Sequence, residues 1–231
     1  MQNRLLAALP AAEFDRLAPH LKPVELALKQ VLHQPNQPLE FVYFPTDGMI
    51  SLITRMQDGS AIETGTVGNE GLVGIPVFLR AERMPVEAFC QIPGSAMRMT
   101  SATFQREVTP DLALYRLLQR YTQALFNQSA QSAACNRLHT IEARFCRWML
   151  MTRDRVNDDQ FPMTQEFLAE MLGVQRSSVN LIAATIQRAG LIEYRRGQMT
   201  ILDRAGMEEV ACECYAVIRE EFDRLVRGSQ P

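Results

Sequence analysis

The sequence predicts an α+β protein with an N-terminal antiparallel β-roll, a long helix and a C-terminal winged helix-turn-helix. Three observations support this fold class. Brief β-prone runs alternate with turns over residues 24–100, heptad spacing begins after Pro110, and residues 163–202 follow the order helix, turn, helix, hairpin. The predicted domains are therefore 1–109 for the roll, 110–139 for the long helix and 140–231 for the winged domain.

Turn residues separate the short strands expected in the roll. The β-prone runs are FVYF (41–44), GMISLITR (48–55), AIETGTV (61–67) and VEAFCQI (86–92). The segments 45–48 (Pro-Thr-Asp-Gly) and 57–60 (Gln-Asp-Gly-Ser) have residue patterns typical of turns. Such a roll encloses an interior that can hold a small ligand, so we expect residues 1–109 to sense an effector.

The helix expected over 110–139 carries side chains at alternating steps of four and three residues, which is the spacing of a coiled-coil seam. We therefore predict that this helix forms a homodimer. The predicted seam residues are Leu114, Leu118, Tyr121, Leu125, Gln128, Ser132 and Cys135. The alternative is an amphipathic helix packed on its own roll, which Leu117 favours because it widens the apolar face.

The segment MTQEFLAEMLGVQRSSVN has the spacing of a helix-turn-helix. Thr164 is a suitable N-cap, Ala169 is small enough for close helix approach, and Gly173 can adopt the left-handed turn. Val179 and Ile182 are expected to pack the second helix back onto the first. A helical hairpin used only for packing is the alternative, but the hairpin at 192–201 favours a wing and hence a DNA reader.

The local distribution of charge supports a DNA-reading helix-turn-helix. The net charge of the chain is −2, yet residues 174–202 hold four arginines against one acidic residue, Glu193. Because affinity for phosphates depends on the local patch, the overall charge does not exclude nucleic acid as a partner. Arg176, Ser177 and Asn180 are expected to face outward from the second helix.

Composition indicates an ordinary globular protein of 231 residues with 47% hydrophobic and 22% charged residues. The N-terminal segment lacks the pattern of a signal peptide, and the most apolar stretch, 71–79, is far shorter than the roughly 20 residues that cross a bilayer. We expect a cytoplasmic protein without a membrane partner.

The five cysteines form no Cys-x-x-Cys pair, and the three histidines, His20, His33 and His139, are scattered. Cys212 and Cys214 are expected within one helix, where a separation of two residues directs them to different faces. We therefore expect no metal site and assign no cofactor. Cys135 on the predicted seam is a candidate redox switch, the alternative being a packed thiol.

The order of these parts resembles the CRP/FNR superfamily of bacterial transcription regulators. The helix-turn-helix above, PDLALYRLLQRY in the long helix and GNEGLVGIPVF in the roll carry the resemblance, which covers nearly the whole chain. It implies a cyclic-nucleotide-binding-like roll and a homodimer that places two reader helices in successive major grooves of double-stranded DNA. RNA polymerase is a further partner that the resemblance implies.

Within this resemblance, Arg176 matches the arginine that contacts guanine, and Ser177 and Ser178 follow it on the helix. Ser177 and Leu181 depart from the acidic residue and second arginine of the cyclic-AMP-responsive members, so their DNA consensus does not transfer. The DNA-binding residues expected here are Thr164, Gln175, Arg176, Ser177, Ser178, Asn180, Arg195 and Arg196.

The expected effector pocket also departs from the cyclic-nucleotide pattern. Its residues are Gly71, Leu72, Val73 and Gly74, in place of a Gly-Glu-x-Gly turn. The positions of the family's Arg-Ser pair fall near Pro85 and Val86, while Arg80 and Arg83 are displaced. We therefore expect no tight binding of cyclic AMP. Neither an iron–sulfur cysteine cluster at the N-terminus nor a haem ligand pair is indicated.

The sequence thus predicts a homodimeric, sequence-specific DNA-binding regulator controlled by an unidentified signal. Two alternatives belong to other classes. A ligand-responsive module could use its helix-turn-helix to bind protein, and a β-barrel enzyme could share the predicted roll. The second is disfavoured because the chain has no nucleophile elbow, P-loop or metal-protease motif, so we expect no enzyme.

Overall fold

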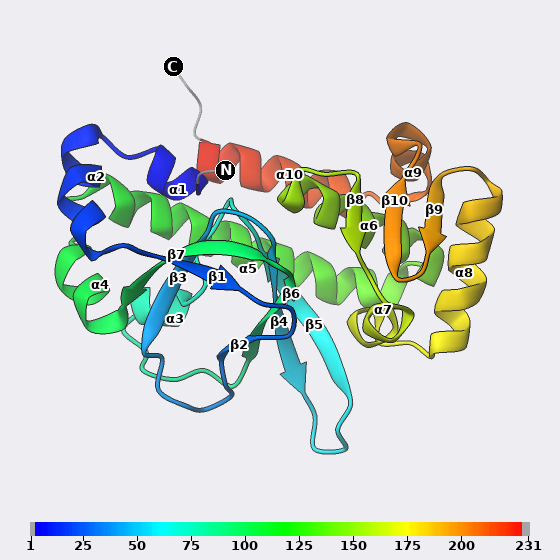
Figure 1. Cartoon of the computed structure of the whole chain (residues 1–231), viewed down its shortest axis with the longest axis horizontal. Helices are drawn as coiled ribbons and strands as arrows, with labels where there is room; N and C mark the ends of the chain where they lie inside the picture. The colour runs from blue at the N-terminus through cyan, green and yellow to red at the C-terminus, as the bar shows by residue number, and fades with distance from the viewer. Residues whose placement is uncertain (1–2, 228–231) are drawn as a thin grey trace.

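The computed structural model describes residues 3–227, so the outermost residues of the predicted first and last domains lie outside the described part. Two antiparallel sheets form the N-terminal roll, a long helix runs beside it, and a smaller three-stranded sheet lies at the other end of the molecule (Figure 1). This is the predicted α+β arrangement. No helix in residues 3–227 is both long and apolar enough to cross a lipid bilayer.

The roll consists of a three-stranded sheet in the order β1-β7-β3 and a four-stranded sheet in the order β2-β6-β4-β5. Four of the strands match the predicted runs within a residue or two. The strands are β1 (Lys22–Leu26), β2 (Val31–His33), β3 (Phe41–Pro45), β4 (Met49–Arg55), β5 (Ala61–Val67), β6 (Glu87–Ile92) and β7 (Gly94–Thr100).

Both predicted turns contain a glycine that needs positive φ. Gly48 (φ +74°) lies so close to the backbone of Ile92 and Pro93 that a Cβ would collide with it, whereas Gly59 (φ +85°) closes the exposed β4–β5 hairpin. Short helices complete the roll: α1 (Arg4–Ala7), α2 (Ala11–Leu17), the 3₁₀ turn η1 (Ala18–His20), α3 (Ile75–Phe78) and α4 (Ser101–Glu107).

The long helix α5 (Ala113–Leu138) is a few residues shorter than the predicted 110–139. Its expected seam faces the protomer's own roll and α10, so it is not free to pair with a second copy. Six of the seven predicted seam residues are buried within the protomer, and Leu125 is half-buried. They pack on the roll and on α10, so the alternative of an amphipathic helix packed on its own protomer is correct for this face. The heptad spacing is the same for either partner, which is why the sequence could not distinguish them.

The C-terminal half begins where α5 ends at His139, whose backbone is extended. Thr140 Oγ1 then accepts a hydrogen bond from Ala143 N (3.3 Å) and caps the next helix. The elements that follow are α6 (Ile141–Val156), β8 (Gln160–Pro162), α7 (Gln165–Leu172), α8 (Arg176–Arg188), β9 (Ile192–Arg195), β10 (Gln198–Ile201), α9 (Arg204–Val210), α10 (Cys214–Phe222) and the π-helical turn η2 (Asp223–Arg227).

One expectation about the cysteines is wrong. Cys212 and Cys214 do not share a helix, because α9 ends at Val210 and α10 begins at Cys214. Ala211 is extended (φ −65°, ψ 150°), and Glu213 is the N-cap of α10. The two sulfurs therefore lie on the same side, where they meet Cys135 and His139.

Candidate nucleic-acid interface

The first helix of the reader, α7, begins at the predicted cap. Thr164 Oγ1 accepts a hydrogen bond from Phe167 N (3.2 Å), which satisfies one free backbone donor of the first turn. Gly173 adopts the left-handed conformation (φ +63°, ψ 42°) directly after α7, and its N–H and that of Val174 bond back to the helix. The turn chemistry expected from the sequence is confirmed.

Three small or apolar residues hold α7 and α8 together. Ala169 is buried at the crossing, and Val179 is completely buried. Ile182 is half-buried beside them. This inward stripe leaves the opposite face of α8 in solvent, where Gln175, Arg176, Ser177 and Asn180 are exposed and Ser178 is half-buried at the edge.

The wing is a tight hairpin. Arg196 (φ 51°) and Gly197 (φ 76°) both have positive φ between β9 and β10, as in a two-residue type I′ turn. Arg195 and Arg196 are exposed at this tip. The sheet order β8-β10-β9 adds a third strand that the sequence did not predict.

Hydrogen bonds fix the wing relative to α7 and α8. Tyr194 Oη donates to the Met163 carbonyl (3.0 Å), Met163 N donates to the Gly197 carbonyl (2.8 Å), and Tyr194 N donates to Gln187 Oε1 (2.7 Å). Burial raises the pKa of Tyr194, so its hydroxyl remains a neutral donor. These hydrogen bonds thus hold the exposed face of α8 and the arginine-bearing tip of the wing in a fixed arrangement on one surface.

Two exposed residues of this surface were not among the predicted site residues. Glu166 on α7 forms an ion pair with Arg176, with 2.6 Å between its Oε1 and Nη1. Leu181 on α8 is 67% exposed beside the polar residues. The exposure of both residues depends on how α7 and α8 pack. The spacing of residues in the sequence therefore could not reveal the Glu166–Arg176 ion pair. The replacement of an arginine by Leu181, in contrast, was visible in the sequence.

The segment expected to form an effector pocket is filled by the protein's own side chains. Leu72 and Val73 are buried, and Gly71 lies against Tyr121 so closely that a Cβ would overlap its phenol ring. Gly74 (φ +111°) also lies close to Val42, whose Cγ1 would be 2.9 Å from an added Cβ. Val73 also pairs with Tyr43 in an isolated β-bridge.

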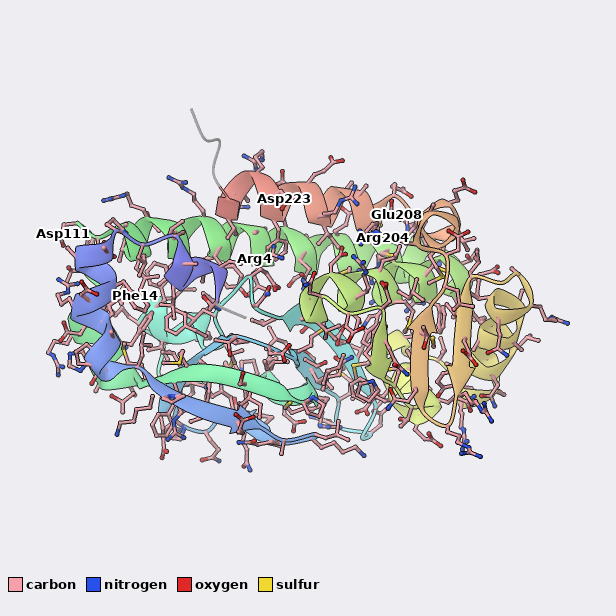
Figure 2. All side chains as sticks on the ribbon, turned by 45° about the horizontal axis from the view of Figure 1, so that its top comes forward. Arg4, Phe14, Asp111, Arg204, Glu208 and Asp223 are labelled. Carbon is pink, nitrogen blue, oxygen red and sulfur yellow. The ribbon has the colours of Figure 1, made fainter. Side chains whose placement is uncertain are left out.

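A cavity of about 330 Å³ lies elsewhere, between α6 and α10. Arg204 of α9 lines the cavity and lies beside Glu208 of the same helix (Figure 2). Arg204 Nη1 also contacts Asp154 Oδ1 (2.9 Å), and Tyr215 Oη donates to Asp154 Oδ2 (2.6 Å). Arg204, one of five arginines that line the cavity, is therefore paired with carboxylates of the protein.

This geometry defines a winged helix-turn-helix beside a β-roll and a long helix. Residues 143–210 match the family model of the Crp-like helix-turn-helix domain. No curated protein gives a significant sequence match to the chain.

Solved structures show the same fold. FixK2 from Bradyrhizobium japonicum has a TM-score of 0.71 at 13% identity, with 83% of this chain and 98% of that chain covered. A CRP-family transcriptional regulator from Thermus thermophilus has a TM-score of 0.69 at 18% identity, with 81% and 96% covered. The c-di-GMP-responsive regulator CLP of Xanthomonas campestris has a TM-score of 0.66 at 16% identity, with 84% and 100% covered.

The chain therefore has the fold of the CRP/FNR transcription regulators, with a Crp-like helix-turn-helix at its C-terminal end. Two of these three structures are described as regulators.

Proposed function

We propose that the protein is a homodimeric regulator that reads an inverted repeat in double-stranded DNA through α8. The observation that carries this proposal is the exposed polar face of α8 beside the arginine-bearing wing. Arginine can donate two hydrogen bonds to guanine in the major groove, so Arg176 is the main specificity residue. Arg195 and Arg196 contact phosphates, which position the domain without reading sequence.

Ser177 and Asn180 extend the reading surface as short hydrogen-bonding side chains, with Gln175 and Ser178 at its edge. The Thr164 hydroxyl keeps a proton that it can donate to a phosphate while its oxygen caps α7. Leu181 adds an apolar side chain of the kind that contacts the thymine methyl group.

We propose that a second copy of the chain occupies the exposed face of α5. Gln119, Gln123, Phe126, Ala130, Ala133 and Arg137 are all exposed and recur at alternating steps of four and three residues. Phe126 is 68% exposed, and the two alanines allow close helix approach. This stripe has the spacing of a coiled-coil seam and lies opposite the predicted one.

Dimerisation has a functional consequence, because a twofold pair of reader domains fits half-sites about 34–36 Å apart. A signal that changes the separation of the two domains would then change the affinity for DNA. The extended backbone at His139, between α5 and α6, is the hinge at which such a change is absorbed.

The test is selection of bound fragments from sheared genomic DNA of the source organism by the purified protein, at about 0.15 M salt, where non-specific attraction is reduced. Enrichment of an inverted repeat supports the proposal, and Arg176→Ala is the matched variant that should lose it. If nothing is enriched, the selection is repeated with cell extract to supply an effector. Absence of enrichment in both selections contradicts DNA reading and favours a protein-binding module.

A further inference from the structure

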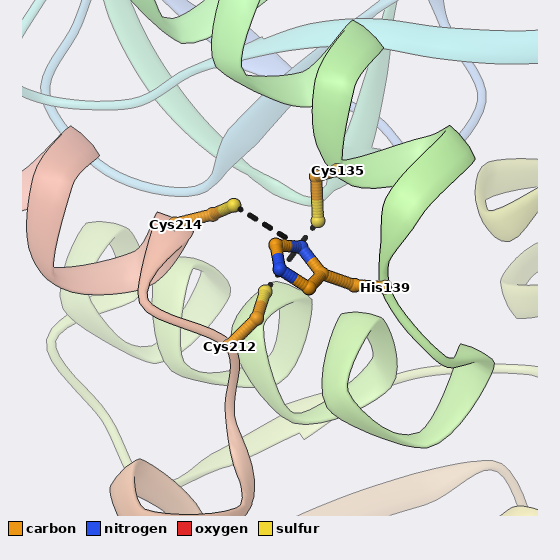
Figure 3. Close-up of side chains that lie close together, drawn as sticks. All are labelled: Cys135, His139, Cys212 and Cys214. Carbon is orange, nitrogen blue, oxygen red and sulfur yellow. Dashed lines mark hydrogen bonds between the residues drawn. The ribbon is translucent and has the colours of Figure 1, made fainter.

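Four side chains of metal-binding type meet beside the end of α5. Cys135 lies on that helix and His139 directly follows it, while Cys212 and Cys214 lie where α9 connects to α10 (Figure 3). Their ligand atoms all lie within 4.8 Å of one another. Cys135 Sγ is 3.4 Å from Cys212 Sγ, and Cys214 Sγ is 3.5 Å from His139 Nδ1.

The local backbone explains why these residues converge. Cys135 and His139 are four residues apart, so they lie on one face at the end of α5. Cys212 precedes α10 and Cys214 opens it, and the break between α9 and α10 turns both sulfurs toward that face. The pairs are 73 or more residues apart in sequence, yet the fold brings them into one cluster.

The dimensions and ligand types suit tetrahedral zinc. A Zn–S bond of about 2.3 Å gives edges of about 3.8 Å between the ligands of a regular tetrahedron, close to the two distances above. Three thiolates and one imidazole form the Cys₃His donor set found in structural Zn(II) sites. Cys135, Cys212 and Cys214 are buried, so the cluster is closed like a structural site and has no position open for a substrate.

The surroundings of the cluster provide an independent second observation. His139 Nε2 lies 3.2 Å from Glu213 Oε2, while Nδ1 of the same ring faces Cys214 Sγ. Such a carboxylate orients a metal-binding imidazole and leaves Nδ1 as the ligand atom. Gln131 Nε2 donates to Cys214 Sγ (3.1 Å), a contact that stabilises a thiolate.

Charge balance points the same way. Arg144 and Arg147 are both buried, and the Nε atom of each guanidinium has no hydrogen-bond partner in the described part of the chain. Both interact electrostatically with Cys135. Three thiolates on one divalent cation carry a net charge of −1, which these buried cations compensate.

We propose that Cys135, His139, Cys212 and Cys214 bind one structural Zn(II) ion that fixes the end of α5 to the α9–α10 connection. Binding replaces the three thiol protons, which pass to solvent. The metal spans the hinge between the long helix and the reader domain and limits its movement. This inference stands apart from DNA binding and can be tested without DNA.

The first experiment measures metal content and metal binding by the full-length chain. The protein purified under reducing conditions should contain about one zinc per chain by mass spectrometry. After removal of zinc, Co(II) should bind one to one, with the strong visible absorption of a tetrahedral site and thiolate charge-transfer bands, and Zn(II) should displace it. Cys135→Ser and Cys212→Ser should abolish this binding, whereas Cys90→Ser, in the roll, should retain it.

A second variant tests the site without removing a metal ligand, in case the cysteine variants fail to fold. Glu213→Gln should keep the one-to-one stoichiometry but weaken Zn(II) affinity by about 10- to 100-fold in competition with a chelator. The exposed Glu209→Gln is the matched control and should leave affinity unchanged. Removal of zinc should increase amide hydrogen exchange over 134–142 and 211–216 while the β-roll remains protected.

Three results would overturn the proposal. One is reduced, folded protein that takes up neither Co(II) nor Zn(II). The second is a Cys135–Cys212 disulfide that persists in anaerobically purified protein with no metal uptake after reduction. The third is zinc binding that is the same in Cys212→Ser as in the unaltered chain.

Discussion

Arg155 of α6 forms a buried ion pair with Glu70 of the roll, with 3.0 Å between Nε and Oε1. Arg155 Nη2 also donates to Gln128 Oε1 of α5 (2.8 Å), and its Nη1 donates to the Met151 carbonyl (3.0 Å). Glu70 in turn accepts the N–H of Gly68. One guanidinium therefore joins the roll, the long helix and the reader domain at a single point.

Replacement of Glu70 by Gln should lower the free energy of unfolding by about 3–5 kcal/mol, because it leaves the buried Arg155 without its counter-charge. Chemical denaturation measures the loss. Glu170→Gln is the control, since it breaks a more exposed contact between the roll and α7, Arg55–Glu170 at 3.3 Å, and should cost about 1 kcal/mol or less. Equal losses in the two variants would contradict the assigned role of Arg155.

The stability of the protein should depend on pH through Glu63. This carboxyl accepts hydrogen bonds from Ser51 Oγ (2.7 Å) and Trp148 Nε1 (2.7 Å) at the boundary between the roll and α6. Burial raises its pKa to about 7, although those hydrogen bonds and the charges of Arg147 and Arg155 act to lower it. The folded protein thus holds the Glu63 proton more tightly than the unfolded chain does.

Because the pKa is raised in the folded state, the stabilisation is complete below about pH 4.5 and is lost as the pH rises through about 7. Glu63→Gln removes this dependence, so the unaltered protein should lose roughly 1–3 kcal/mol relative to the variant between pH 5 and 8. Denaturation curves at several pH values measure it, with the exposed Glu25→Gln as control. Parallel pH profiles for Glu63→Gln and the unaltered protein would exclude this role.

The proposed dimer should depend on the exposed face of α5. Phe126→Asp places a charge in the seam and should convert the dimer to a monomer in sedimentation velocity experiments, because a buried unpaired charge is costly. Met56→Asp alters a similarly exposed hydrophobic residue on the β4–β5 hairpin and should leave the dimer intact. A stable dimer in the Phe126→Asp variant would place the interface elsewhere.

Arg176→Ala should lose roughly 1–3 kcal/mol of specific binding and relax the preference at one base pair. Arg196→Ala should weaken binding to all sequences to a similar degree and reduce the salt dependence. Glu166→Gln should tighten binding, because it releases Arg176 from its ion pair and removes a carboxylate from the DNA face. Fluorescence anisotropy measures the DNA affinity of the three protein variants for the selected site and for its single-base variants. An equal loss of affinity on every DNA sequence for Arg176→Ala would show that Arg176 contacts a phosphate instead.

Cyclic AMP should give no measurable heat of binding at micromolar protein concentration in titration calorimetry. The polar anchors of the cyclic-nucleotide pattern are missing, and Tyr121 and Val42 occupy the space beside the Gly71 and Gly74 backbone. Micromolar affinity would contradict this expectation and require Tyr121 to move.

The elements that the sequence predicted well depend on contacts between near neighbours along the chain. The reader is an example: Thr164 caps α7, Gly173 makes the turn and Val179 packs back, all within 16 residues. Strand alternation and turn residues likewise predicted four strands of the roll to within a residue or two. Local dihedral preferences and periodic burial suffice for such elements.

Features built from distant residues followed only from the folded chain. The heptad pattern of α5 could be satisfied by a second copy or by the protomer's own roll, and packing of Tyr121 against Gly71 selected the roll for that face. Cys135 and Cys212 are 77 residues apart, and only the break between α9 and α10 brings their sulfurs together. The periodicity of apolar residues in the sequence indicates which side chains of one helix or strand share a buried face. Long-range packing determines which other element covers that face.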